Sequence, residues 1–439
     1  MQVSEDGSSE EELTTESAMI GLCQTSQHTA YANLKSTASK SLSDELIAAA
    51  HRGVDVHVVL APGAHDTTWL LQQHLESSGV DVDVHSAVPG VTMIADGRAL
   101  VSGKIIQAAA TVATHTTKFT TILDGTEPSR GSLLSSGVVV LAMPDASRDR
   151  IVQVFDAARM TIDLEIYQLQ ERRVTKALED ASARGVKVRV MLEPKTVGAV
   201  NFTAMSAELS KAGITVRKTP SAFDSSHNVD HAKFAVVDGK ELLVGTGNLV
   251  RSGLGGVSTV EYANRDFWIE DARTASISEA SALFEADWAQ RSTSSMQFSR
   301  LVVTPDNADA RIVALIDGAK QRLDVYNQSL KDATLIERLI AAKKRGVAVR
   351  VLLGYQPGFG GHPADNQAAI DQLTAGGVEA QFLKAHYLHA KAIVADGSVY
   401  IGSQNFTNGG LYNNREVGEV LTDPKAALIV EKTFVDDLN

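Results

Sequence analysis

One pattern occurs three times along the chain and constrains the fold more than any other feature of the sequence. The segments LIAAAHRGVDVHVVLAP (46–62), LEDASARGVKVRVMLEP (178–194) and LIAAKKRGVAVRVLLGY (339–355) share apolar residues at helical spacing, an Arg-Gly pair and a Val-rich alternating stretch. Gly is favoured directly after a helix, and alternation of apolar and other residues is typical of a strand. Each segment therefore predicts a helix followed by a strand, and the recurrence predicts three units of similar build.

A second helical pattern and a hairpin follow in every unit, so we expect an α/β fold of α-β-α sandwich units with mixed sheets. Turn-rich stretches near 124–137 and 290–300 separate the units. We expect an acidic, mobile tail over residues 1–34, a degenerate unit over 35–140, and two further units over 141–300 and 301–439.

Charge and cysteine content exclude some classes of protein. The net charge of −12 argues against nonspecific binding of a long polyanion, which needs a basic surface. The single cysteine, Cys23, excludes an internal disulfide and a cysteine metal cluster, and we expect it to be a small buried side chain. No apolar run is long enough for a membrane span, so we expect a soluble chain whose compartment stays open.

The hairpins carry the motif that points to chemistry. HAKFAVVDG (231–239) and HAKAIVADG (389–397) are nearly the same phrase, whereas the first unit has PGVTMIADG (89–97). The first unit therefore keeps Asp96 and Gly97 but has Pro89 and Val91 where the others have His and Lys. This difference separates residues that the fold needs from residues that a reaction needs.

The alternation of strand side chains supports the same division. His231 and Lys233 share one face of a strand, and Asp238 has the opposite parity. The same holds for His389, Lys391 and Asp396 in the later copy. We therefore expect Asp238 and Asp396 to be structural residues at the hairpin turn.

Polar residues recur at matched distances after each hairpin. GTGN (245–248) corresponds to GSQN (402–405), and NRDF (264–267) corresponds to NREV (414–417). The first unit has TTKF, with Lys118 in place of the acid, so it lost the acid together with the His. That joint loss predicts that His231 works with Asp266 and His389 with Glu416. We expect the phosphate or substrate to be bound by Thr246, Asn248, Ser403 and Asn405.

Taken singly, each of these residues has an ordinary structural explanation, such as a core histidine or an edge lysine. Their joint recurrence favours a catalytic site for an oxyanion. A carboxylate on one imidazole nitrogen fixes the tautomer, so that the other nitrogen can act as nucleophile or carry a proton. Lysine and asparagine stabilise the phosphate oxygens.

The two HxKxxxxD phrases, followed by GTGN and GSQNFT, resemble the motifs of the phospholipase D superfamily over residues 141–439. The resemblance implies two active repeats related by a pseudo-two-fold axis, a degenerate third repeat, and a metal-independent reaction without a cofactor. It also implies a phosphohistidine intermediate, with His231 as nucleophile, His389 as general acid, and Lys233 and Lys391 in the catalytic set. The sequence symmetry itself leaves the choice between the two histidines open.

The substrate class divides the superfamily. We favour phospholipid hydrolysis or phosphatidyl transfer, with transient contact to a membrane surface, because the chain is acidic. Nuclease action by the same mechanism and a catalytically idle phosphate-binding scaffold are the alternatives. We expect a monomer, because the degenerate unit can cover the face that a symmetric dimer would use.

Overall fold

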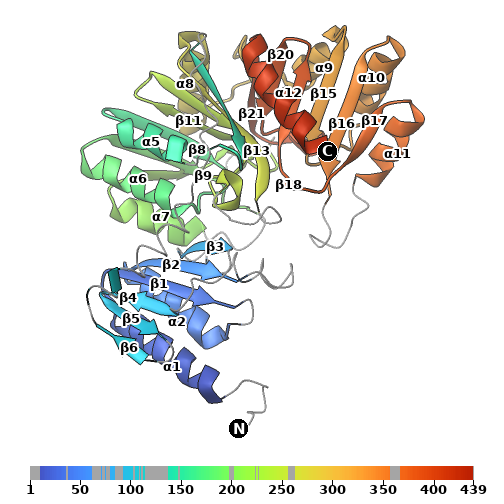
Figure 1. Ribbon diagram of the computed structural model, residues 1–439. Coiled ribbons are helices and arrows are strands. Elements are labelled where there is room, and N and C mark those ends of the chain that lie inside the picture. The colour runs from blue at the N-terminus through green and yellow to red at the C-terminus, as the bar shows by residue number, and fades with distance from the viewer. Residues whose placement is uncertain are drawn as a thin grey trace.

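The computed structural model describes residues 10–35, 38–61, 71, 75, 80–84, 92–101, 104–107, 109, 112–113, 137–146, 149–196, 202–222, 224–225, 227–255, 263–355 and 366–438. These residues form three mixed α/β units, each on its own sheet, which confirms the expected fold class. Figure 1 shows the first unit at the N-terminal end and the two later units side by side above it.

The first unit is a six-stranded sheet in the order β3-β2-β1-β4-β5-β6. Strands β1, β2 and β3 are parallel, and β4 to β6 form an antiparallel meander. Its elements are α1 (Glu10–Thr25), β1 (Thr29–Leu34), α2 (Lys40–His51), β2 (Asp55–Leu60), β3 (Asp81–Val84), β4 (Met93–Ala95), β5 (Arg98–Val101) and β6 (Lys104–Ile106).

The expected tail over residues 1–34 is wrong for residues 10–34. Helix α1 buries Met19, Leu22 and Cys23 in the core of the first unit. Strand β1 occupies the middle of the sheet, between β2 and β4. The acidic composition concealed a helix whose few apolar side chains suffice for packing. One of its acids, Glu16, is used structurally, since its carboxylate accepts a hydrogen bond from the backbone N–H of Ser39.

The second unit has an eight-stranded sheet in the order β10-β9-β8-β11-β12-β13-β18, with β7 also paired to β13. It begins at Val138, slightly before the expected boundary, because β7 pairs along β13. Its elements are β7 (Val138–Met143), α5 (Asp149–Ala157), β8 (Thr161–Ile166), α6 (Arg172–Ala183), β9 (Lys187–Leu192), α7 (Phe202–Lys211), β10 (Thr215–Lys218), η1 (Pro220–Ala222), β11 (Lys233–Val237), β12 (Glu241–Gly245), η2 (Ser252–Leu254), β13 (Asn264–Asp271) and α8 (Thr274–Trp288).

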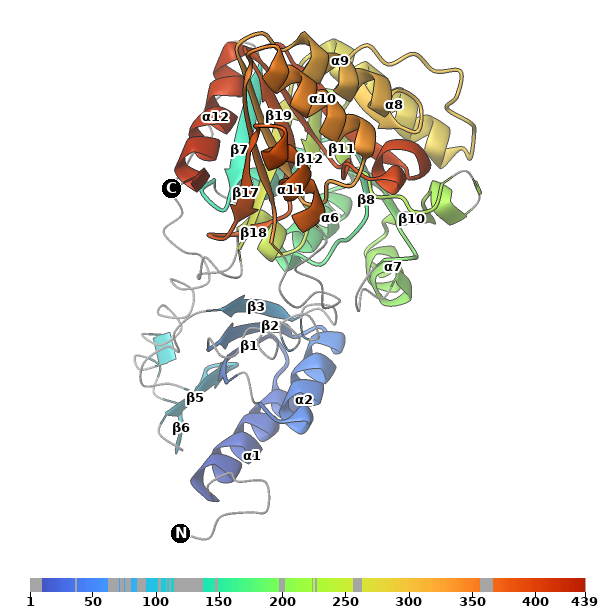
Figure 2. The same ribbon diagram turned by 90° about the vertical axis from the view of Figure 1, so that its right-hand side faces the viewer.

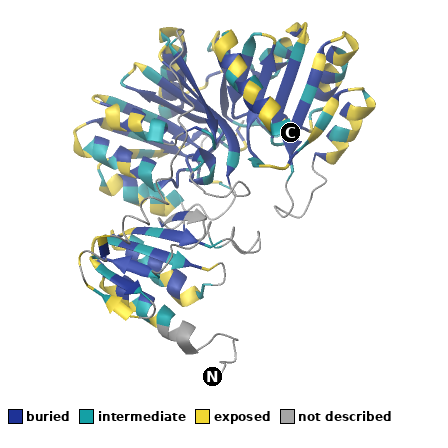
Figure 3. Cartoon of the chain, viewed as in Figure 1, coloured by how far each residue is buried: buried dark blue, intermediate teal, exposed yellow. Residues whose placement is uncertain are grey.

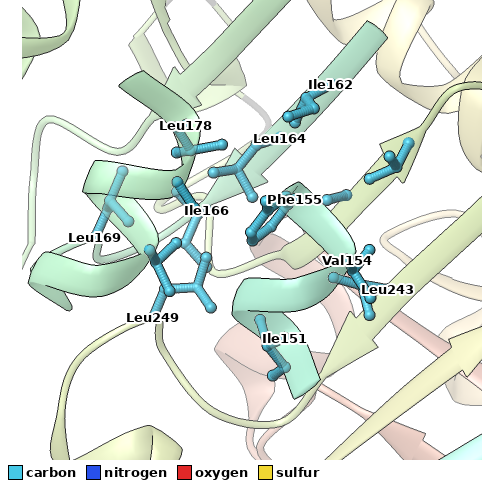
Figure 4. Packing of buried hydrophobic residues seen from close by; sticks show 14 of the residues in the cluster. Ile151, Val154, Phe155, Ile162, Leu164, Ile166, Leu169, Leu178, Leu243 and Leu249 are labelled. Atoms are coloured by element: carbon cyan, nitrogen blue, oxygen red, sulfur yellow. The ribbon is translucent and has the colours of Figure 1, made fainter. Parts of the chain in front are cut away.

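Helices cover both faces of this sheet. Phe155 of α5 and Leu178 of α6 pack on Leu164 of β8 in the core of one face (Figure 4). On the other face, Phe284 of α8 packs against Phe234 of β11, with ring centroids 6.4 Å apart. The unit is therefore a three-layer α-β-α sandwich.

The third unit repeats this build on a seven-stranded sheet in the order β14-β21-β20-β19-β15-β16-β17. Its elements are β14 (Leu301–Thr304), α9 (Ala308–Gly318), β15 (Arg322–Asn327), α10 (Ala333–Lys344), β16 (Ala348–Gly354), α11 (Gln367–Ala375), β17 (Glu379–Leu383), β18 (Tyr387–Leu388), β19 (Lys391–Ala395), β20 (Ser398–Gly402), η5 (Gly409–Asn413), β21 (Glu416–Leu421) and α12 (Pro424–Leu438).

The second and third units are joined by reciprocal contacts. Strand β18 of the third unit pairs in parallel with β13 of the second. Helix α12 packs on its own sheet and also along β7 (Figure 2), while α8 packs on its own sheet and on β14. The strands between these helices are almost entirely buried (Figure 3). We call these two units the active halves.

The three hairpin turns share one structural device. Asp96, Asp238 and Asp396 all have left-handed backbone conformations, with φ of 44°, 54° and 53°. Each carboxylate accepts hydrogen bonds from three consecutive backbone N–H groups, which belong to residues 27–29, 159–161 and 320–322 respectively. These are the contacts expected of structural residues. Within the described part of the chain, no helix is both long and apolar enough to cross a bilayer.

Candidate active site

The two motif histidines meet where the active halves join. His231 lies just before β11, and His389 lies between β18 and β19. Their ring centroids are 6.5 Å apart, and the ring planes are inclined by 62°. Both side chains are nearly buried, with exposed fractions of 13% and 10%. Residues 158 positions apart in sequence therefore converge on one place.

Each histidine is bound to a carboxylate from the opposite half, so the pairing expected from the sequence is wrong. His231 Nδ1 lies 2.9 Å from Glu416 Oε2, and His389 Nδ1 lies 3.0 Å from Asp266 Oδ1. The exchange follows from the way the halves are joined. The backbone N–H of His231 donates to the carbonyl of Arg415, and that of His389 donates to the carbonyl of Arg265. Each acid immediately follows the arginine that receives this bond.

Thr246 and Ser403 differ from expectation as well, because both are buried beside the carboxylates. Thr246 Oγ1 donates to Asp266 Oδ1 at 2.6 Å and accepts from the backbone N–H of Phe267. Ser403 Oγ accepts from the backbone N–H of Val417. A hydrogen bond from the Ser403 side chain also lowers the pKa of Glu416, against the larger effect of burial. The hydroxyls therefore position the acids and do not face a substrate. The expected parity failed because β12 and β20 end at Gly245 and Gly402, before these residues.

Further groups fix the two carboxylates. Asn414 Nδ2 donates to Glu416 Oε1 at 2.9 Å, and Asn264 Nδ2 lies 3.4 Å from Asp266 Oδ2. Gly247 has no room for a side chain, since a Cβ there would lie 2.6 Å from Asp266 Oδ2. The acids are thus held from several sides, as a catalytic imidazole requires of its partner.

Both motif lysines are fully buried, but their contacts differ. Lys233 Nζ donates to the carbonyl of His231 at 2.5 Å and lies 5.2 Å from the centroid of the Tyr167 ring. Lys391 Nζ donates to the carbonyl of His389 at 2.5 Å and to Gln328 Oε1 at 3.0 Å. It also lies 3.4 Å from both ring nitrogens of His389.

Of the two motif asparagines, Asn248 is buried and Asn405 is half-buried. Asn248 Nδ2 donates to Gln168 Oε1 at 2.8 Å. The side-chain oxygens of Asn248 and Asn405 are buried, and neither has a hydrogen-bond partner among the described residues. Of the four residues expected to bind phosphate, these two keep a buried polar atom that a ligand could use, and that atom is a hydrogen-bond acceptor.

Burial and charge make the two His–carboxylate pairs unequal. Burial and the neighbouring Lys233 hold the pKa of His231 well below its ordinary value. Burial raises the pKa of its partner Glu416 to about 7, against the opposing effect of Lys233. In the other pair, burial is overcome by the charge and hydrogen bond of His389, so the pKa of Asp266 is lowered. Asp266 is therefore the more firmly ionised acid, and the pKa of His389 is lowered mainly by burial and Lys391.

Sequence reasoning missed the residues that surround the lysines. Tyr167 follows β8 directly, and its ring lies at 68° to that of His231, with centroids 4.9 Å apart. Gln328 follows β15 directly, and its Nε2 donates to Tyr387 Oη at 3.2 Å. The available signal was their place directly after β8 and β15, the second strand of each half, because the residue types differ.

A buried ionic framework, also missed, ties the halves together. Arg415 pairs with Asp287 of α8 and with Asp306, and Arg265 pairs with Asp437 of α12 and with Asp145. Each arginine thus reaches an acid on the last helix of the opposite half. Since both arginines are nearly inaccessible, these pairs fix the register in which the halves meet. Among the described residues, no group of three or more His, Cys, Asp or Glu side chains could hold a metal ion.

Comparisons with known proteins agree with this architecture. The family described as "Cardiolipin synthase, PLD-like domain" matches residues 151–288 and 312–438. The minor cardiolipin synthase ClsB of Bacillus subtilis is 25% identical over 285 residues, which cover 60% of this chain and 70% of the relative. A phospholipase D of Rickettsia bellii is 30% identical over 105 residues, which cover 24% of this chain and about half, 49%, of that protein.

Solved structures show the same fold at low sequence identity. Phosphatidylserine synthase of Haemophilus influenzae has a TM-score of 0.54 at 10% identity, over 69% of this chain and 87% of that one. Polyphosphate kinase of Porphyromonas gingivalis has a TM-score of 0.52 at 20% identity, over 69% of this chain and 50% of that one. With the family match spanning both active halves, the chain belongs to the phospholipase D superfamily, in its cardiolipin synthase, PLD-like family.

Proposed function

We propose that the chain is a phosphodiesterase acting through a covalent phosphohistidine, and that it hydrolyses phospholipid headgroup esters or transfers the phosphatidyl group to an alcohol. The observation that carries the proposal is the approach of His231 and His389, with centroids 6.5 Å apart, each on a buried carboxylate. A carboxylate on Nδ1 leaves Nε2 of each ring to meet the substrate.

The inequality of the two pairs supports His231 as the nucleophile. Attack on phosphorus needs an unprotonated nitrogen, and the pKa of His231 is held well below its ordinary value by burial and Lys233. Protonation of the leaving oxygen needs a charged ring. Asp266, whose pKa is lowered by His389 in spite of burial, is the carboxylate better able to stabilise one. We therefore assign His389 as the general acid.

The proposed reaction then has two steps. His231 Nε2 forms a bond to phosphorus while the P–O bond to the leaving alcohol breaks, and the leaving oxygen takes the proton of His389 Nε2. Water or an acceptor alcohol next gives its proton to His389 and attacks phosphorus. The P–N bond breaks, which restores both imidazoles.

The site has to stabilise the negative charge on the phosphate oxygens. Lys391 supplies buried positive charge, and the equally buried Lys233 supplies a second amine donor. Such fixed groups act strongly because little water competes for the oxyanion. The proposed mechanism needs no metal ion.

The lipid substrate is supported by two observations. The net charge of −12 is unfavourable for nonspecific binding of a nucleic acid backbone. The curated relatives include a cardiolipin synthase and phospholipases D. A phospholipid substrate implies transient contact with a membrane surface, which we also propose.

A substrate panel tests the proposal. Purified protein is given phosphatidylcholine, phosphatidylglycerol, single-stranded DNA, duplex DNA and an aryl phosphodiester, each with and without EDTA. We expect release of a lipid headgroup, or its exchange with added glycerol, to be unchanged by EDTA and accompanied by no DNA cleavage. Cleavage of DNA alone would favour a nuclease, turnover of none of the substrates would favour a scaffold, and strict metal dependence would defeat the mechanism.

We also propose that the chain acts as a monomer. Both His–Lys sets belong to one chain, and the reciprocal contacts of α8 and α12 already join the halves that form the site. Sedimentation equilibrium should give the mass of one chain, 46.8 kDa. A tight dimer formed through residues 10–113 would contradict this proposal.

A further inference from the structure

The two active halves differ in the residues that lie beside their lysines. Lys233 is opposite Ile166 in the pairing of β11 with β8, and Lys391 is opposite Asn327 in the pairing of β19 with β15. The residue directly after β8 is Tyr167, and the residue directly after β15 is Gln328. Equivalent backbone sites therefore present a ring to one lysine and an amide to the other.

The amide gives Lys391 a directed partner. Gln328 Oε1 accepts from Lys391 Nζ at 3.0 Å, and its Nε2 donates to Tyr387 Oη at 3.2 Å. The contact with the ammonium group fixes which end of the amide faces the lysine, because an amide nitrogen could not accept from it, and the hydroxyl of Tyr387 can then accept from the other end. Tyr387 is in turn stacked beside His389, with centroids 6.4 Å apart and planes inclined by 23°.

Lys233 has no amide at the equivalent position. Its described contacts are the carbonyl of His231 and the face of Tyr167, at 5.2 Å from the ring centroid. A ring face attracts a cation less directionally than a carbonyl oxygen does. The two motif lysines therefore have different partners, a ring face for Lys233 and an amide oxygen for Lys391.

We propose that Gln328 is a positioning residue that keeps Lys391 charged and aimed at the phosphate, so that Lys391 is the lysine whose proton limits turnover at alkaline pH. This inference rests on the proposed phosphodiesterase function. It does not follow from the repeated motif, because the motif is the same in both halves.

The surroundings of Lys391 favour loss of its proton near pH 8. Burial lowers the pKa of Lys391 to about 8, against the raising effect of the two carboxylates. For Lys233, burial lowers the pKa well below its ordinary value. The titratable groups that face or influence Lys391 from the packed elements are His231, Lys233, Asp266, His389 and Glu416.

The direct test follows the Cε resonances of ¹³C-lysine-labelled protein as the pH is raised, with the Lys391 signal assigned by Lys391→Arg. Gln328→Leu removes the acceptor, so the midpoint of Lys391 should fall by about one pH unit. Gln328→Glu places a carboxylate there, so the midpoint should rise. Tyr167→Gln should raise the midpoint of Lys233 and move that of Lys391 much less than Gln328→Leu does.

The kinetic test uses the pH dependence of kcat/KM with the aryl phosphodiester. We expect the alkaline limb to move with the Lys391 midpoint, so that Gln328→Leu loses about fivefold at pH 8 and much less at pH 6. Gln372→Leu makes the same change on the exposed face of α11 and should behave as wild type, which controls for surface effects. Thermal unfolding confirms that each variant is folded.

The outcomes separate this inference from the proposed function. An unmoved Lys391 midpoint in Gln328→Leu would overturn the inference whether or not the protein is active. A uniform loss of rate at every pH would show a merely structural role and would also overturn it. Absence of wild-type turnover on every phosphodiester would defeat the proposed function. The NMR midpoints would then still decide whether Gln328 holds the proton of Lys391.

Discussion

The first unit and the active halves share a hairpin but use the neighbouring sheet differently. Asp96 binds three backbone N–H groups in the first unit, as Asp238 and Asp396 do in the halves. The cross-strand pairs Asp163–Arg189 and Asp324–Arg350 are salt bridges, whereas the equivalent pair in the first unit is a stack of Tyr31 on His57. The hairpin is thus a property of the fold, and the chemistry is added to it. Pro89, Val91 and Lys118, which marked the first unit as degenerate, lie outside the described residues.

The largest effect should come from the histidines that the first unit lacks. His231→Asn and His389→Asn should each lower kcat by about 10³-fold or more, because each removes a nucleophile or a proton carrier. Single-turnover assays with a labelled phosphodiester measure the loss. Trapping of phosphoenzyme in wild-type protein and its absence in His231→Asn would confirm the nucleophile, and trapping in His231→Asn would reassign it.

The next effect distinguishes the two halves. Asp266→Asn removes the acid that favours the charged form of His389, so we expect kcat with an alkyl leaving group to fall by about 10–100-fold. A nitrophenyl leaving group needs no proton, so the loss should be far smaller there. Glu416→Gln should lower the turnover of both substrates, because it removes the carboxylate that is bound to the nucleophile His231. Equal losses for Asp266→Asn on both substrates would refute the division of roles.

A third effect concerns stability, and it compares two buried acids in the half that carries His231 with the residues at the equivalent positions of the other half. Glu165 and Asp230 are fully buried, and the equivalent positions in the other half are Tyr326 and Leu388. Burial raises the pKa of Asp230 to about 8 and holds that of Glu165 well above its ordinary value. The folded protein therefore binds protons that the unfolded chain has already released above about pH 4.

The sign of the pH dependence follows from these directions. Because the folded pKa lies above the unfolded value, the stabilising effect is lost as the pH rises through about 8. Between pH 5 and pH 9, the free energy of unfolding should fall by more than about 1 kcal/mol further in wild type than in Asp230→Asn. Urea denaturation measures this difference. The surface variant Asp371→Asn should keep the wild-type slope, and a wild-type slope in Asp230→Asn would count against protonation of Asp230 in the folded protein.

The smallest effect should be in the first unit. Asp96→Asn removes the charge that receives the backbone N–H groups of residues 27–29, which should cost about 1 kcal/mol of stability. Turnover per folded molecule should stay the same, because no described contact links this turn to the histidines. Thermal melts and kcat on the same samples test both statements, and a loss of kcat would show that the first unit takes part in the reaction.

The sequence was sufficient for the repeats, the α/β units and the two His–Lys sets, since each depends on local periodicity or on a recurring phrase. The partners of the histidines could not be found in the same way. Exchanging Asp266 and Glu416 between the halves gives the same internal symmetry, so only the joining of β13 and β18 decides the pairing. The hydroxyls of Thr246 and Ser403 were misplaced because side-chain alternation ends with the strand. Helix α1 was missed because its acidic residues masked a short apolar stripe.

Because the carboxylates are exchanged, each active half depends on the other for the acid that binds its histidine. Asp266 is encoded with the first active half but serves the imidazole of the second, and Glu416 does the reverse. A lesion in either acid therefore damages the histidine whose own segment is intact. Neither half can therefore lose its acid without impairing the other, so the two halves have to be kept together.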